Sequence, residues 1–146
     1  MKTSLPRQQK GAVAIEFALV FVVFFAVFYG VVAYSLPLLL MQSFNQATSE
    51  AVRRSVALDP NTPNYPTAVV NLSNQVLAQQ LQWIPSRFNL VPGVDTSSAY
   101  AGGTLTVSVN YPSAKLAQVI PLLVLPGIGT VPSLPATLRA QSSLTF

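Results

Sequence analysis

The chain has 146 residues with a mean hydropathy of +0.48, and only 8% of its residues are charged. It has no cysteine and no histidine, which excludes a disulfide scaffold, a thiol nucleophile and a histidine-based metal or acid–base site. The formal net charge of +4 falls to +1 beyond residue 11, without a dense basic patch, so we expect no nucleic-acid partner.

The first segment, residues 1–11, is short and polar and contains three basic residues, Lys2, Arg7 and Lys10, but no acidic one. Basic residues beside an apolar run tend to stay on the cytoplasmic side of a membrane. We therefore expect a cytoplasmic N-terminus and an exported C-terminal part.

An apolar run follows, in which no charged residue occurs from Phe17 to Ser49 and Glu16 lies at the N-terminal edge. At about 1.5 Å per residue, roughly 20 apolar residues in a helix cross a hydrocarbon core of about 30 Å. We predict a helix over residues 12–58, of which residues 12–40 span a membrane. A cleaved signal peptide fits poorly, because its apolar region is only about 7–15 residues long. An uncleaved signal anchor fits the length and the charge equally well.

Pro37 lies inside this predicted helix, where a proline removes one backbone hydrogen bond and should produce a kink. Beyond Met41, apolar and small residues recur at three- and four-residue steps. This pattern predicts that the second half of the helix packs on a domain. The alternative is two separate helices divided at Pro37.

Residues 59–146 are predicted to form one small exported domain that begins with a second helix. Three prolines in residues 59–66 interrupt the first helix. The apolar pattern over residues 66–83 then predicts a helix with Pro66 in its first turn, and Pro85 ends it.

After this helix, the spacing of apolar residues changes from the helical period to the two-residue alternation of strands. Alternating side chains predict a strand over residues 104–111 and a final, antiparallel strand over residues 134–146. Residues 87–95 are predicted to form a short edge strand interrupted by Pro92-Gly93. Residues 115–125 are apolar but too short to span a bilayer, which predicts a hydrophobic loop or one-turn helix on the sheet or at the membrane surface. The fold class is therefore α+β.

The start of the apolar run resembles a known processing signature. Gly11, the run Ala12–Ile15 and the pair Glu16-Phe17 follow a basic leader and precede an apolar helix, as in type IV prepilins. The sequence GAVAIEFALV is most similar to that of the TadE-like pseudopilins of the tight-adherence (Tad) pilus. The resemblance implies a pilin-like fold and cleavage between Gly11 and Ala12 by a prepilin peptidase, which would remove the leader, residues 1–11.

The resemblance also implies a role for Glu16 and the neighbouring Phe17 in assembly. Cleavage would create a new ammonium group on Ala12, about one helical turn from Glu16. In the family, this glutamate is thought to meet the N-terminal amine of a neighbouring subunit. Because an unpaired desolvated carboxylate is costly, such a pair would set the axial register between subunits. An interfacial glutamate without a function is the simpler alternative.

From these observations we expect a structural, non-enzymatic protein, without catalytic residues, metal or cofactor. It would be a minor pilin or pseudopilin of a Tad-type pilus, since major subunits of that system are usually little more than the helix. Its partners would be the prepilin peptidase, other pilin subunits, the inner-membrane assembly platform and the lipid bilayer. We expect it in the bacterial inner membrane as a single-pass protein and, after assembly, either in the pilus or at its base. The alternative is an uncleaved single-pass membrane protein whose exported domain binds an unrelated partner.

Overall fold

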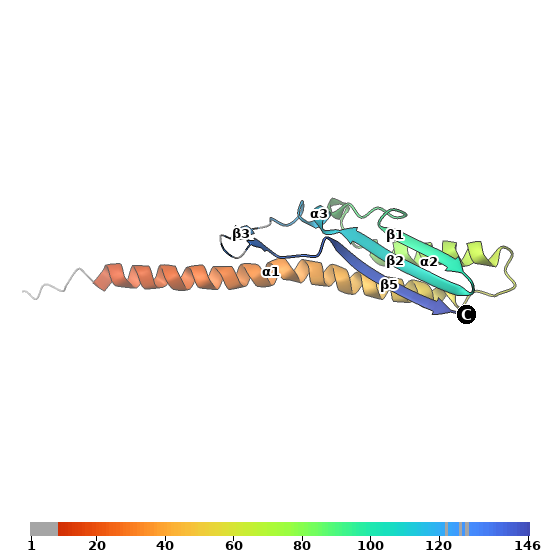
Figure 1. Ribbon diagram of the computed structural model, residues 1–146. Coiled ribbons are helices and arrows are strands. Elements are labelled where there is room, and N and C mark those ends of the chain that lie inside the picture. Colours follow the sequence, from red (N-terminus) through yellow and green to blue (C-terminus); the bar gives the residue numbers. More distant parts are fainter. Residues whose placement is uncertain (1–8, 122, 126, 128) are drawn as a thin grey trace, which may run out of the picture.

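The computed structural model describes residues 9–121, 123–125, 127 and 129–146. The predicted leader residues Lys2 and Arg7 therefore lie outside the described residues. A single long helix, α1, extends from a small domain that packs along its C-terminal half (Figure 1).

Helix α1 (Gln9–Ser55) is 47 residues long and contains Pro37 in its interior. The prediction of one long helix is confirmed, and the alternative of two helices divided at Pro37 is wrong. The helix ends three residues earlier than expected. Beyond Ser55 the backbone changes to shorter-range bonds, in which the amides of Ala57 and Leu58 donate to the carbonyls three residues before them.

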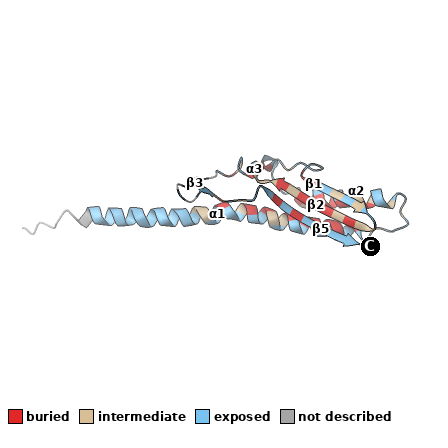
Figure 2. Cartoon of the chain, in the orientation of Figure 1, coloured by how far each residue is buried: buried red, intermediate tan, exposed pale blue. Residues whose placement is uncertain are grey.

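Burial divides α1 into two halves (Figure 2). Every residue from 11 to 28 is exposed, and the first buried side chain is Ala33. Phe44 and Ala51 further along are fully buried. The predicted amphipathic pattern beyond Met41 is confirmed, since this half of α1 provides much of the core.

Helix α2 (Tyr65–Leu81) is antiparallel to the end of α1 and packs against it (Figure 1). Pro66 occupies its first turn as predicted. A proline is tolerated there because the N–H groups of the first turn have no acceptor within the helix. Its buried face is formed by residues at helical spacing: Val69, Ser73, Val76, Leu77 and Leu81.

Three strands form an antiparallel sheet in the order β1-β2-β5. They are β1 (Thr96–Ala101), β2 (Thr104–Pro112) and β5 (Thr137–Thr145). In β2 the burial alternates strictly, which confirms both the predicted strand and its inward face. The final strand and its antiparallel direction are also confirmed. The inward residues of β2 are Leu105, Val107, Val109 and Tyr111.

The predicted edge strand over residues 87–95 is wrong. This segment contains a 3₁₀ turn, η1 (Ser86–Phe88), followed by irregular backbone, and the edge strand is β1 instead. Asn89 has a φ of 51° and Gly93 a φ of 83°, which a strand does not accommodate. The carboxylate of Asp95 accepts a hydrogen bond from the amide of Val91 at 2.7 Å and closes the loop locally.

Between β2 and β5 the chain forms a one-turn helix, α3 (Ser113–Leu116), and a small hairpin of β3 (Leu123–Leu125) and β4 (Gly129–Val131). A one-turn helix was one of the two expectations for this region, whereas the hairpin was not predicted. The hairpin extends beyond the sheet and lies beside α1 (Figure 1). The hydroxyl of Tyr29 donates to the carbonyl of Pro121 near its start.

The core lies between the sheet and the two helices, which cover one face of the sheet. Helix α1 contacts β5 and β2, and α2 contacts β1. Phe44 of α1 packs against Tyr111 of β2 with ring centroids 5.9 Å apart, and both side chains are buried. Burial raises the pKa of Tyr111 to about 12, and its hydroxyl donates to the carbonyl of Phe88 at 2.7 Å. The α+β fold class is confirmed.

We predict that Phe44→Ala destabilises the domain by about 3–5 kcal/mol, because it leaves a cavity against Tyr111. The measurement is urea unfolding of the full chain in mild detergent, followed by the emission of Trp83, the one tryptophan. Phe25→Ala is the matched control, since Phe25 is 53% exposed and should leave the midpoint unchanged. Equal effects of the two substitutions would contradict this location of the core.

Candidate functional site

The N-terminal half of α1 is an exposed apolar surface. Among the described residues, α1 is the one helix long and apolar enough to cross a membrane. The mean hydropathy of its most apolar segment is 2.6, and no residue of that segment is buried. Phenylalanine rings stack along it one turn apart, from Phe17 to Phe21 at 6.1 Å and from Phe21 to Phe25 at 6.2 Å. In water, so much exposed apolar surface would be unfavourable, so this surface requires lipid or protein to cover it.

The predicted cleavage bond, Gly11–Ala12, lies in the first turns of this helix, and both residues are exposed. Lys10 lies in the same turn of backbone. A Cβ atom added at Gly11 would meet no heavy atom within 4 Å. The helix therefore has no steric need for glycine at this position, and any requirement for it must come from something that binds there.

Glu16 is exposed on the same helix, four residues after Ala12. Four residues correspond to a rise of about 6 Å, so the two positions are neighbours on one face. Among the described residues, Glu16 is in no ion pair. The structure thus places the predicted site residues Gly11, Ala12, Glu16 and Phe17 together, whereas Pro37 lies more than five turns away and is buried by the domain.

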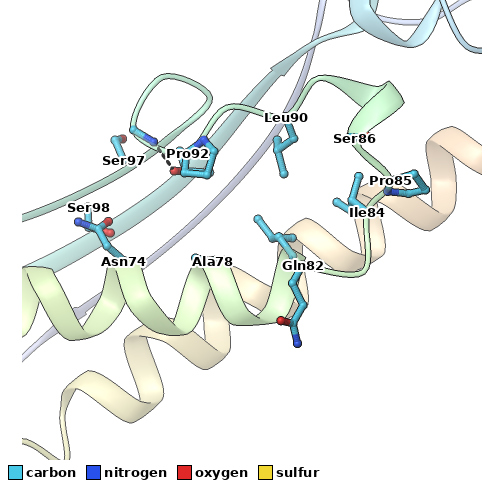
Figure 3. Close-up of a pocket in the computed structure, with 13 residues that line it drawn as sticks. Asn74, Ala78, Gln82, Ile84, Pro85, Ser86, Leu90, Pro92, Ser97 and Ser98 are labelled. Atoms are coloured by element: carbon cyan, nitrogen blue, oxygen red, sulfur yellow. Dashed lines mark hydrogen bonds between the residues drawn. The ribbon is translucent and has the colours of Figure 1, made fainter.

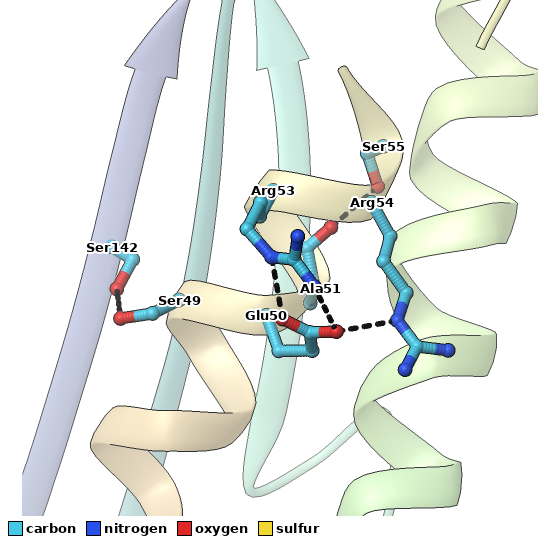
Figure 4. Close-up of polar contacts among 7 residues, drawn as sticks. All are labelled: Ser49, Glu50, Ala51, Arg53, Arg54, Ser55 and Ser142. Atoms are coloured by element: carbon cyan, nitrogen blue, oxygen red, sulfur yellow. Dashed lines mark hydrogen bonds and ion pairs between the residues drawn. The ribbon is translucent and has the colours of Figure 1, made fainter. Parts of the chain in front are cut away.

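At the other end of α1, Glu50 accepts hydrogen bonds from two arginines of the next turn (Figure 4). Its carboxylate lies 2.8 Å from Nε of Arg53 and 2.6 Å from Nε of Arg54. The hydrogen bonds from Arg53 and then Arg54 lower the pKa of Glu50 from 4.5 to about 2. These arginines lie beyond the apolar run and oppose the expected orientation, but both are paired with the one carboxylate of Glu50.

Hydroxyl groups on the opposite side of this turn join α1 to β5. The hydroxyl of Ser142 lies 3.0 Å from that of Thr48. It also lies 3.1 Å from that of Ser49 (Figure 4). These bonds fix the register of the helix against the edge of the sheet.

An ion pair between Asp95 and Lys115 fixes the loop before β1 to α3, and sequence reasoning missed it. The ammonium group lies 2.6 Å from Oδ2 and 2.8 Å from Oδ1 of Asp95, whose side chain is 3% exposed. Lys115 also donates to the carbonyl of Asn89 at 3.0 Å. Because all three groups are satisfied within the fold, this pair is structural rather than poised for chemistry.

A cleft of about 650 Å³ lies between the end of α2, the following loop and β1 (Figure 3). None of the residues that line it is titratable at neutral pH; its polar groups are amides and hydroxyls such as those of Asn74, Gln82 and Ser98. It therefore offers no acid–base or nucleophilic chemistry. Within the described residues there is also no group of three side chains suited to hold a metal ion.

These features define a class: a membrane-anchored protein in which one apolar helix extends from a small α+β domain. A family model described as TadE-like protein matches residues 11–53, which is α1 without its first two and last two residues. The TadE-like resemblance predicted from the sequence is thereby confirmed for the anchor helix. Comparisons with curated proteins and with solved structures gave no significant match.

We predict that the stabilising effect of Glu50 depends on pH. Because its pKa is lower in the folded chain than in the unfolded one, the effect is complete above about pH 4.5 and is lost as the pH falls to about 2. The unfolding midpoints of the wild type and Glu50→Gln should differ above pH 4.5 and converge near pH 2.

The difference between the two midpoints should be small and should decrease with added salt, because the arginine side chains are 75% and 47% exposed. A difference that persists unchanged at pH 2 would show that the substitution acts through something other than the carboxylate charge.

Proposed function

We propose that this protein is a minor pilin, or pseudopilin, of a Tad-type pilus. It is made as an inner-membrane precursor, cut after Gly11 by a prepilin peptidase, and assembled with other pilin subunits through α1. The observation that supports this most is the TadE-like match, which begins at Gly11 and extends along α1 to Arg53.

The geometry of α1 agrees with a helix that exchanges lipid for protein neighbours. Every residue of α1 from 11 to 28 is exposed, so that surface is free for a bilayer first and for other subunits later. The domain covers only the C-terminal half, beginning at Ala33, and so does not obstruct packing of the first half.

Glu16 is suited to a role in register. It is one carboxylate on an exposed apolar surface, next to Phe17 and one turn from Ala12. Cleavage would place a positive amine at Ala12 in every subunit. A carboxylate and an amine that are both removed from water are stable only when paired, so only one axial offset between neighbouring helices is favourable.

The expected orientation places the leader in the cytoplasm and the domain on the exported side. The domain has no acid–base chemistry in its cleft, which supports a structural role for it in the filament or its base. Adhesion and biofilm formation would then be properties of the assembled pilus.

We predict that Gly11→Ala slows removal of residues Met1–Gly11 when the precursor is expressed with its peptidase. Alanine is sterically accepted here and favours helix by about 1 kcal/mol, so the effect would come from recognition rather than folding. Intact-mass spectrometry of the membrane-extracted protein measures the processed fraction. Gly30→Ala is the matched control, because Gly30 is in the same helix with equally open space.

Retention of the leader in the wild-type protein would overturn the pilin proposal and favour an uncleaved single-pass protein. Equal processing of both glycine variants would show that Gly11 is not recognised.

We predict that Glu16→Ala and the near-isosteric Glu16→Gln are inserted and cleaved but assemble at least about tenfold less, the change that a loss of about 1.4 kcal/mol per contact produces. The reason is that the partner of the carboxylate lies in another subunit. Subunits recovered in sheared pili measure assembly, and Glu50→Gln is the matched control on the same helix. Normal pilus formation with either Glu16 variant would contradict the register role.

A further inference from the structure

We propose that the β3–β4 hairpin is a second membrane contact, which inserts into the interfacial region of the bilayer on the side where the domain lies. This contact requires only that α1 spans the membrane. It goes beyond the proposed pilin function and applies equally to an uncleaved anchor.

The hairpin is uncharged and has an apolar, exposed surface. No charged residue occurs between Lys115 and Arg139, and the polar residues of this interval of 23 residues are few: Gln118, Thr130, Ser133 and Thr137. Val124 is 73% exposed and Leu123 is 41% exposed. Transfer of such side chains from water into lipid is favourable, by about 25 cal/mol per Å² of apolar surface.

The backbone of the hairpin is suited to such an environment. Strands β3 and β4 pair antiparallel, with Leu123 opposite Val131 and Val124 opposite Thr130. Paired strands satisfy part of their own N–H and C=O groups, and the interface supplies water and headgroups for the remainder. The interface therefore tolerates this hairpin, whereas the hydrocarbon centre would not.

Two tyrosines of α1 hold the ends of this segment against the helix. The hydroxyl of Tyr29 donates to the carbonyl of Pro121 before β3, and the hydroxyl of Tyr34 accepts a hydrogen bond from the amide of Ser133, after β4, at 3.0 Å. The hairpin therefore lies level with this part of α1, away from the rest of the sheet (Figure 1).

The dimensions of a bilayer place that level at the membrane boundary. With Ala12 at the cytoplasmic boundary, Tyr29 lies about 26 Å and Tyr34 about 33 Å along the helix axis. A hydrocarbon core of about 30 Å ends between them. Tyrosine is enriched at this depth, where its ring contacts lipid and its hydroxyl reaches polar groups. The uncovered part of α1, which ends before Ala33, has the matching length.

Lipid is the occupant that these observations favour over a second copy of the chain. The exposed side chains of Leu123 and Val124 belong to a hairpin beside α1, and the exposed apolar surface of α1 requires lipid where the helix spans the membrane (Figure 1). A second contact beside the helix would also restrain the tilt of the domain, because two points on the bilayer fix an orientation that one helix alone does not.

The absence of cysteine from the chain permits a direct test with single-cysteine variants. An environment-sensitive fluorophore is attached to Val124→Cys in the full chain, which is reconstituted into phosphatidylcholine vesicles. Lipids with a spin-label quencher near the acyl carbonyl, or near the middle of the chain, then report depth. Two controls are exposed positions: Val23→Cys in the middle of the span and Ala101→Cys in the β1–β2 hairpin at the far end of the domain.

We expect the fluorophore at position 124 to be quenched several-fold more than that at position 101, and more by the shallow quencher than by the deep one. Position 23 should show the opposite depth preference. Quenching at 23 but not at 124 would overturn the hairpin contact and leave the anchor intact. Quenching at neither would overturn both. Blue-shifted emission at 124 without lipid quenching would mean that a second copy covers the hairpin, which also overturns the proposal.

Discussion

The structure depends on one constraint: a single continuous helix must satisfy two environments along its length. The first half of α1 is apolar around most of its circumference and is exposed from residue 11 to residue 28, whereas the second half is amphipathic and provides the core with Phe44 and Ala51. A helix that is apolar all round belongs in lipid or among other apolar helices, and one with a single apolar face belongs against a sheet. The change between the two patterns, near Ala33, decides where the domain begins.

The domain is attached to α1 by contacts of different kinds that all lie on this second half. Apolar packing in the core, which includes Phe44 on Tyr111, supplies the larger part of the free energy, and the hydroxyl bonds of Thr48 and Ser49 with Ser142 supply the register. The Glu50 ion pairs lie outside the core and contribute less, because solvent screens them. The position of the domain on the helix is therefore determined by shape, and only weakly by charge.

Patterns that are local in sequence predicted most of the fold. Strict alternation in β2 and the helical spacing in α1 and α2 each follow from neighbouring residues. Strand β1 was missed because its sequence, TSSAYA, is a poor strand former that is held by pairing with β2. The pair Asp95–Lys115 joins residues 20 apart, and the β3–β4 hairpin occurs where prolines and glycines indicate a loop. For Gly11 and Glu16, the geometry shows only exposure, and the family resemblance carries the functional interpretation.

The continuity of α1 through Pro37 connects the two ends of the molecule mechanically. Pro37 is buried, and α1 continues through it although a proline removes one backbone hydrogen bond. From Glu16 to Phe44 the helix rises about 42 Å without a break. An axial offset fixed at Glu16 would therefore be transmitted to the domain as the same offset, because a continuous helix neither shortens nor unwinds over this distance. The pairing of Glu16 would in this way determine the spacing of the domains, which begin their main packing about eight turns further along the helix.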